Sequence, residues 1–262
     1  MGMTRTQLAG LLLALSSGAQ ALPVIEPDTG LAFSSEEFVA RGRTLYREKV
    51  DDLAARGLLG SSTAFRRRAN RIFDRIVAAA RTQGDQAAAT HWELGVTVAP
   101  DETASAFASG QVLVSEAFVE RLGLNDAELA YVIGHEVSHV LLEHARAYAT
   151  VALALLPHNV PRSLSDVYAE MNFDLGLDFR LAPFSVDAEF EADDAGLLIA
   201  ALAGYPPADM LGLFDKIERH SGAGGGLLQT HGLNGERRAR ARTALPLAER
   251  VYGRGLIPAA GP

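Results

Sequence analysis

The sequence His-Glu-Val-Ser-His at residues 135–139 constrains the fold of this chain more than any other feature. Two histidines four residues apart lie about 400° around an α-helix, so both imidazoles can face one metal ion where the backbone is helical. Glu136 follows the first histidine and is close enough to reach a water molecule at that metal without binding the metal itself. The motif therefore predicts a metal site with His135 and His139 as ligands and Glu136 as general base.

The residues around the motif have the pattern of a buried helix. Asn125 begins a capping-box pattern, and apolar residues recur at helical spacing after it. We expect this helix to continue to about Thr150. On such a helix His144 lies nine residues, or about 900°, from His135 and therefore on the opposite side. We expect His144 to have a structural role rather than to share the metal.

A catalytic zinc site needs a third protein ligand and an open position. A histidine at the metzincin spacing is excluded, because Leu142 and Ala145 occupy the positions that would carry glycine and histidine. A later acidic run is the better candidate. Glu189 and Asp193 share one face of a helix, whereas Glu191 is turned about 200° away from Glu189. We expect Glu189 to bind the metal and Asp193 to accept the free N–H of a ligating histidine, although an acidic run taken alone usually marks an exposed face.

Composition excludes several classes of protein. The chain has no cysteine, which excludes disulfides, thiolate metal sites, a cysteine nucleophile and a lipid anchor on an N-terminal cysteine. The formal net charge is −8, so we expect no nucleic-acid partner. The length of 262 residues and the hydrophobic content of 48% suit one globular domain.

The first 21 residues have the pattern of a cleavable export signal. Arg5 supplies the positive charge, residues 8–15 form a short apolar core, and Ala19-Gln20-Ala21 is a small-x-small cleavage site. That core is too short for a membrane span, which needs about 20 residues. We expect residues 22–262 to form a single periplasmic domain with no transmembrane segment and at most a peripheral association with a membrane. The alternative is an uncleaved N-terminal helix of a cytosolic protein.

The remaining patterns predict an α+β fold that is mostly helical. We expect a small sheet to pack against the helix that carries His135 and His139, and the helix that carries Glu189 to cross that same helix. An exposed edge strand around residues 107–114 would be able to pair with an extended substrate beside the metal helix. The other predicted elements are helices at 34–57, 62–81, 207–220 and 234–245 and strands at 91–98 and 111–115.

The paired motifs H-E-x-x-H and E-x-x-x-D, followed by Ala203-Gly204-Tyr205-Pro206, resemble the zinc metallopeptidase family of HtpX and the CAAX prenyl proteases. The block at 104–143 and the element Thr230-His231-Gly232 are also similar to that family, and the resemblance covers most of the mature chain. It implies a zincin-type metalloprotease domain. With an export signal and no membrane span, the chain resembles the soluble periplasmic branch typified by BepA and LoiP, although it lacks a tract of tetratricopeptide repeats and a lipoprotein cysteine.

The resemblance implies one zinc ion per chain, bound by His135, His139 and Glu189, and a protein or peptide substrate. The implied reaction is hydrolysis of peptide bonds in unfolded or misassembled exported proteins, with Glu136 taking a proton from the attacking water and returning it to the leaving amine. The oligomeric state does not follow from the sequence.

A second group that stabilises the oxyanion would help this reaction, and His231 and Arg237 are the candidates. His231 would either donate a hydrogen bond to the oxyanion or occupy the open metal position as a gate. Val186 stands where the family commonly has an arginine, so Arg237 or Arg180 would have to order the carboxylate helix in its place. The other departures from the family pattern are Asp194, Gly232 and Ser105, which replace a basic residue, a proline and an asparagine.

Three hypotheses follow from these motifs. The leading one is a zinc metalloendopeptidase. The alternative is a zinc-binding periplasmic chaperone or assembly factor with weak or gated proteolysis, for which the departures at Val186 and Asp194 are the only support in the sequence. The third is a purely structural metal site, which predicts four closed ligands and no room for water.

Overall fold

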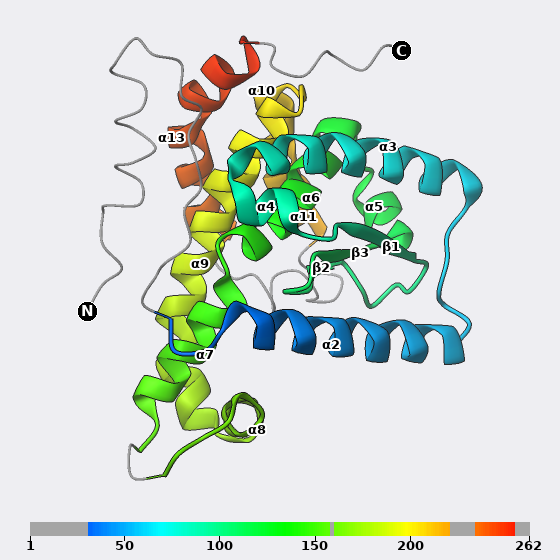
Figure 1. Cartoon of the computed structure of the whole chain (residues 1–262). Coiled ribbons are helices and arrows are strands. Elements are labelled where there is room, and N and C mark those ends of the chain that lie inside the picture. The colour runs from blue at the N-terminus through cyan, green and yellow to red at the C-terminus, as the bar shows by residue number, and fades with distance from the viewer. Residues whose placement is uncertain (1–30, 158–159, 221–233, 255–262) are drawn as a thin grey trace.

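The structure is a computed structural model that describes residues 31–157, 160–220 and 234–254. These residues form a mostly helical domain with one small sheet, which confirms the expected α+β class (Figure 1). The helices are α2 (Ser35–Ala55), α3 (Thr63–Ala80), the short 3₁₀ turn η1 (Arg81–Gln83), α4 (Asp85–Ala89), α5 (Glu116–Leu122), α6 (Asp126–Leu141), α7 (His144–Leu155), α8 (Leu164–Phe173), α9 (Leu175–Leu202), α10 (Pro207–Met210), α11 (Gly212–His220) and α13 (Asn234–Tyr252), and the strands are β1 (Glu93–Thr97), β2 (Ala104–Ala106) and β3 (Gln111–Ser115).

The sheet has the strand order β1-β3-β2, with β1 parallel and β2 antiparallel to β3. Strand β3 is buried along its whole length and pairs on both sides. The expected edge strand at residues 107–114 is therefore wrong, because β3 is central and β2 is the edge that packs against α6. Alternation could not identify β2, since a strand of three residues is too short to show a period.

Helices α2 and α3 lie on either side of the sheet (Figure 1). Both begin as their capping patterns predict: Ser34 forms a capping box with Glu37, and the hydroxyl of Ser62 accepts a hydrogen bond from the amide of Phe65. The apolar face of α3 is buried in the main core. From α2, the ring of Tyr46 packs edge-on against Phe107, with centroids 5.2 Å apart.

Helix α6 lies at the centre of the main core, between α3, α9 and the sheet. Where it crosses α9, Gly134 faces Gly196. A Cβ atom at Gly196 would lie 2.6 Å from the backbone nitrogen of His135, and one at Gly134 would lie 2.8 Å from the carbonyl oxygen of Gly196. Glycine at both positions therefore allows the two backbones to touch. This close crossing brings α9, which carries Glu189 and Asp193, against α6, which carries His135 and His139.

Helix α6 does not continue to Thr150 as expected. It ends at Leu141, and Glu143 adopts the left-handed conformation, with φ 50° and ψ 36°, before α7 begins at His144. Glu143 is the only non-glycine residue with positive φ in the described part of the chain. Glycine or proline usually marks such a turn, and neither is present here. The local sequence therefore could not show where the helix ends.

A second, smaller core joins α7 and α8 to the first half of α9 and to Phe38 at the start of α2. Two other predicted helices differ in extent. The one at 207–220 is divided into α10 and α11, and the one at 234–245 continues to Tyr252. None of the described helices has the length and apolar character that a membrane crossing requires. The expected export signal lies outside the described residues.

Candidate active site

Three side chains from α6 and α9 meet at one point in the structure. The Nε2 atoms of His135 and His139 are 3.1 Å apart, and each lies 3.4 Å from a carboxylate oxygen of Glu189. A tetrahedral zinc ion with ligand bonds of about 2.0–2.1 Å holds neighbouring ligand atoms about 3.3 Å apart. The two imidazoles and the carboxylate therefore fit zinc in both chemistry and spacing. The structure brings together the three residues that the sequence predicts as ligands.

The electrostatic surroundings of the two histidines differ. Burial alone would lower the pKa of His135, but the hydrogen bonds and negative charges of Asp193 and Glu189 raise it to about 10. Burial lowers the pKa of His139 to about 3, against the hydrogen bond to Glu189 and with the help of the neighbouring imidazoles. The site thus attracts positive charge at His135 and keeps His139 in the neutral form that binds metals.

Asp193 and Arg237 lie behind His135. The Oδ1 atom of Asp193 is 3.0 Å from Nδ1 of His135, and Arg237 of α13 donates hydrogen bonds of 2.6 and 2.7 Å to the two oxygens of Asp193. Burial would raise the pKa of Asp193, but Arg237 and His135 lower it to about 2. The Asp193 carboxylate therefore stays ionised and accepts the Nδ1 proton of His135, so Nε2 is the atom that faces Glu189 and would bind a metal on losing its own proton. Arg237 also lies 3.3 Å from Glu189.

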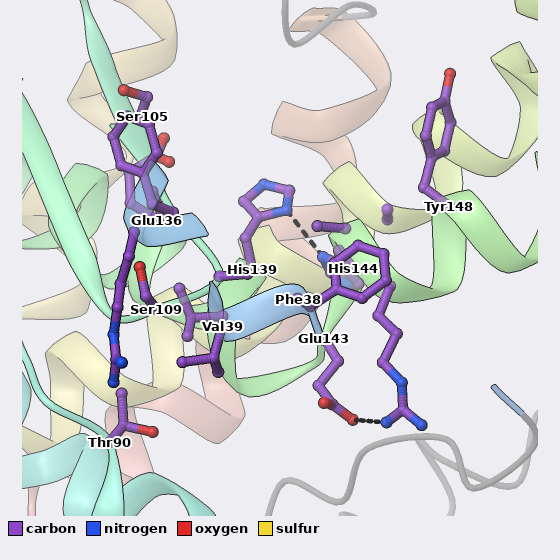
Figure 2. A pocket seen from close by; sticks show the side chains of 18 of the residues that line it. Phe38, Val39, Thr90, Ser105, Ser109, Glu136, His139, Glu143, His144 and Tyr148 are labelled. Carbon is purple, nitrogen blue, oxygen red and sulfur yellow. Dashed lines mark hydrogen bonds and ion pairs between the residues drawn. The ribbon is translucent and has the colours of Figure 1, made fainter. Parts of the chain in front are cut away.

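His144 lies next to the site, and the expectation that it points away is wrong. The chain turns at Glu143, so Nδ1 of His144 comes within 2.9 Å of Nδ1 of His139 (Figure 2). The Nε2 atom of His144 is 3.3 Å from Glu191. The calculated rotation of 900° assumed a continuous helix and fails because α6 ends at Leu141. Analysis of the sequence missed both His144 and Glu191 as parts of the site, and the only signal was the nearby third histidine.

Glu136 and His139 line a cleft with a volume of about 930 Å³ (Figure 2). Glu136 itself is buried, so little of its carboxylate reaches bulk water. Ser105 belongs to the wall formed by the β2 edge, and Phe38 to the wall formed by α2. Next to Phe38, Tyr168 of α8 contributes a second aromatic ring, with the two centroids 6.3 Å apart. The cleft is therefore bounded by the sheet edge on one side and by the second core on another.

The remaining predicted residues lie in different places. Arg180 donates to the backbone carbonyls of Gly176 and Leu155, so Arg237 rather than Arg180 holds the carboxylate helix at the site. Asp194 pairs with Arg240, 2.8 Å away. His231 lies outside the described residues.

Comparison with known proteins gives a family and several relatives. A model of peptidase family M48 matches residues 66–245, a range that includes all three proposed ligands and Arg237. The mitochondrial metalloendopeptidase OMA1 of Arabidopsis thaliana is 33% identical over 148 residues, which cover 53% of this chain and 29% of that protein. The metalloprotease YcaL of Escherichia coli (strain K12) is 25% identical over 218 residues, which cover 79% of this chain and 85% of that protein.

The OMA1 of Saccharomyces cerevisiae (strain ATCC 204508 / S288c) is 25% identical over 177 residues, covering 62% of this chain and 49% of that protein. The chain thus spans less than half of either OMA1 protein and most of YcaL. The resemblance to a metallopeptidase family is confirmed at the level of M48. Because the family model matches well over half of the residues and includes the histidine–glutamate site, the chain belongs to peptidase family M48.

Proposed function

We propose that this chain is a zinc-dependent endopeptidase that hydrolyses peptide bonds in unfolded or misassembled exported proteins. One observation carries the proposal: His135, His139 and Glu189 have the spacing of zinc ligands beside a cleft that Glu136 also lines. The relative YcaL is a metalloprotease and OMA1 is a metalloendopeptidase, which supports the reaction type.

When bound, zinc supplies a Lewis acid that polarises the scissile carbonyl and activates a water molecule. Glu136 accepts a proton from the attacking water and returns it to the leaving amine. Arg237 is held by two carboxylates, so we assign it to ordering Asp193 and Glu189. We retain His231 as the candidate donor to the oxyanion, or as a gate at the open metal position.

The edge of the sheet supports an extended substrate. Strand β2 lines the cleft beside Glu136 and pairs only with β3 among the described strands. A polypeptide that lies along β2 would be recognised through its main chain, which favours unfolded segments over compact ones. The export pattern of residues 1–21 and the likeness to the BepA and LoiP branch support a role in periplasmic quality control.

The test compares the wild type with Glu136→Gln and with the exposed control Glu120→Gln. We expect one zinc ion per chain in all three proteins by metal analysis. In a casein digestion assay, Glu136→Gln should lose roughly 10²–10⁴-fold in rate, the typical contribution of a positioned acid or base, and Glu120→Gln should lose nothing. A strong chelator should abolish cleavage, and added zinc should restore it.

A wild type that binds no zinc, or a Glu136→Gln variant that cleaves casein at the wild-type rate, would contradict the proposal. Client binding without measurable cleavage in the zinc-loaded wild type would favour the chaperone hypothesis instead.

A further inference from the structure

His144 and Glu191 form a chain of hydrogen bonds behind His139 that the chemistry above does not use. A histidine that binds a metal through Nε2 carries its proton on Nδ1. His139 would then donate from Nδ1 to the Nδ1 atom of His144, 2.9 Å away. A neutral His144 that accepts at Nδ1 has its own proton on Nε2, and that atom lies 3.3 Å from a carboxylate oxygen of Glu191. All the donors and acceptors are consistent with one another.

We propose that His144 and Glu191 are positioning residues that set the tautomer and the orientation of His139, an inference that rests on the proposed zinc site. Glu191 accepts from His144, His144 accepts from His139, and His139 directs Nε2 toward Glu189 and His135. His144 is 7% exposed, so water does not compete strongly for its ring nitrogens.

The backbone at Glu143 supports this assignment independently. A left-handed residue with a side chain costs roughly 1–2 kcal/mol relative to the right-handed conformation. The Glu143 carboxylate is paired with Arg146 at 3.0 Å, and Arg146 also donates to the carbonyl of Phe33, just before α2. The surrounding contacts therefore hold the unfavourable turn in place. That turn is what directs His144 back onto His139 instead of away from it.

A purely structural role for His144 is the competing explanation, since the residue also joins α7 to α9 through Glu191. The two explanations differ in what they predict for metal binding. A spacer between helices would affect stability alone. A positioning residue would affect zinc affinity and the ligand field at the metal, even in a variant that folds normally.

The experiment measures zinc affinity by competition with a chromogenic chelator and records the absorption spectrum of the Co²⁺-substituted protein. His144→Phe keeps the ring and removes both nitrogens, so we expect zinc affinity to fall roughly 10- to 100-fold, as for other residues that support a metal ligand. The Co²⁺ bands should shift as well. Asp187→Asn, an exposed change on the same helix α9, serves as the control and should match the wild type.

Two smaller variants keep the test valid if His144→Phe does not fold. The amide of His144→Asn lies near the position of Nδ1 and can still accept from His139, whereas the amide of His144→Gln lies near Nε2 and faces Glu191. We expect His144→Asn to bind zinc several-fold more tightly than His144→Gln. Zinc affinity of His144→Phe within twofold of the wild type, or of His144→Gln equal to or above that of His144→Asn, would overturn the proposal. A wild type without zinc would instead refute the proposed function.

Discussion

The two histidines of the motif lie one turn apart on the same helix, yet the structure supports them in opposite ways. His135 contacts the ionised carboxylate of Asp193, which is 1% exposed and accepts two hydrogen bonds from Arg237. His139 contacts the ring of His144, whose Nδ1 lies 2.9 Å from its own Nδ1, and Glu191 lies one step further away and is 22% exposed. A positive charge at the buried His135 needs a buried partner of opposite sign. His139 lines the cleft and its lowered pKa keeps it neutral, so it needs no such partner. Burial therefore decides which kind of support each histidine can have.

Asp193→Asn, which removes the charge that supports His135, should have the largest effect. The change removes the charge of Asp193 from Arg237, which still contacts Glu189, and removal of one partner from a buried ion pair costs up to about 3–5 kcal/mol. Zinc affinity should also fall roughly 10- to 100-fold, because His135 loses the acceptor that fixes its tautomer. Urea unfolding of the metal-free protein and chelator competition measure the two effects separately.

Asp194→Asn is the matched control for that experiment, since Asp194 is the next residue and also pairs with an arginine of α13. Burial raises the pKa of Asp194, so the site tolerates a neutral side chain. Asp194 is 12% and Arg240 37% exposed, so the pair is partly open to water and its loss should cost about 1 kcal/mol or less. Equal losses in the two variants would show that burial does not distinguish the two carboxylates.

Arg237→Lys should produce the next largest effect. Lysine keeps the charge but cannot make the paired hydrogen bonds to Asp193 or contact Glu189 at the same time. We expect a loss of about 1.5–3 kcal/mol in the free energy of unfolding, the contribution of a hydrogen bond to a charged group. Arg240→Lys should lose less than about 1 kcal/mol in the same denaturant series. If the lysine at position 237 were harmless, the charged support of His135 would not depend on guanidinium geometry.

Gly196→Ala tests whether both supports depend on the same helix crossing. The new methyl group would meet the backbone of His135 at 2.6 Å, so α9 must move away from α6. Overpacking of this kind costs about 1–3 kcal/mol, and the movement should weaken zinc binding because α9 carries Glu189. The control is Gly235→Ala, where a Cβ atom would meet no atom of the described residues within 4 Å, and it should be neutral or slightly stabilising in thermal unfolding. Unchanged zinc affinity in Gly196→Ala would mean that the crossing does not set the metal site.

Local sequence patterns predict most of the arrangement around His135, Glu189 and Asp193. The capping box at Asn125 gives the start of the metal helix, and the four-residue spacing places Glu189 and Asp193 on one face of α9. These residues lie together in the structure because each spacing applies within one unbroken helix. The sequence offers Arg180 and Arg237 as arginines that would order α9, and the contacts of Arg237 with Glu189 and Asp193 select it.

The support of His139 by His144 depends on tertiary contacts that no local sequence pattern contains. The segment before His144 is rich in leucine, a strong helix former, and the helix nevertheless ends at Leu141 because Glu143 turns the chain and is held by Arg146. The glycines at 134 and 196 each look like weak helical positions, and their pairing exists only in three dimensions. The edge strand β2 is equally dependent on its neighbour β3. Tertiary contacts therefore determined the features that the sequence analysis missed.

Glu191→Gln should have the smallest effect. It is the same type of change as Asp193→Asn, but at the carboxylate next to His144 instead of the one next to His135. Glutamine at this position keeps an oxygen that accepts from Nε2 of His144, so the tautomer of His139 is preserved. The lost charge is partly exposed and one residue removed from the ligand, so zinc affinity should change by less than about fivefold, or about 1 kcal/mol. Chelator competition on Glu191→Gln and Asp193→Asn, measured together, decides the point. If both variants lose zinc affinity to the same extent, the negative charge of Glu191 supports His139 as that of Asp193 supports His135, and the distinction between a charged and a neutral support fails.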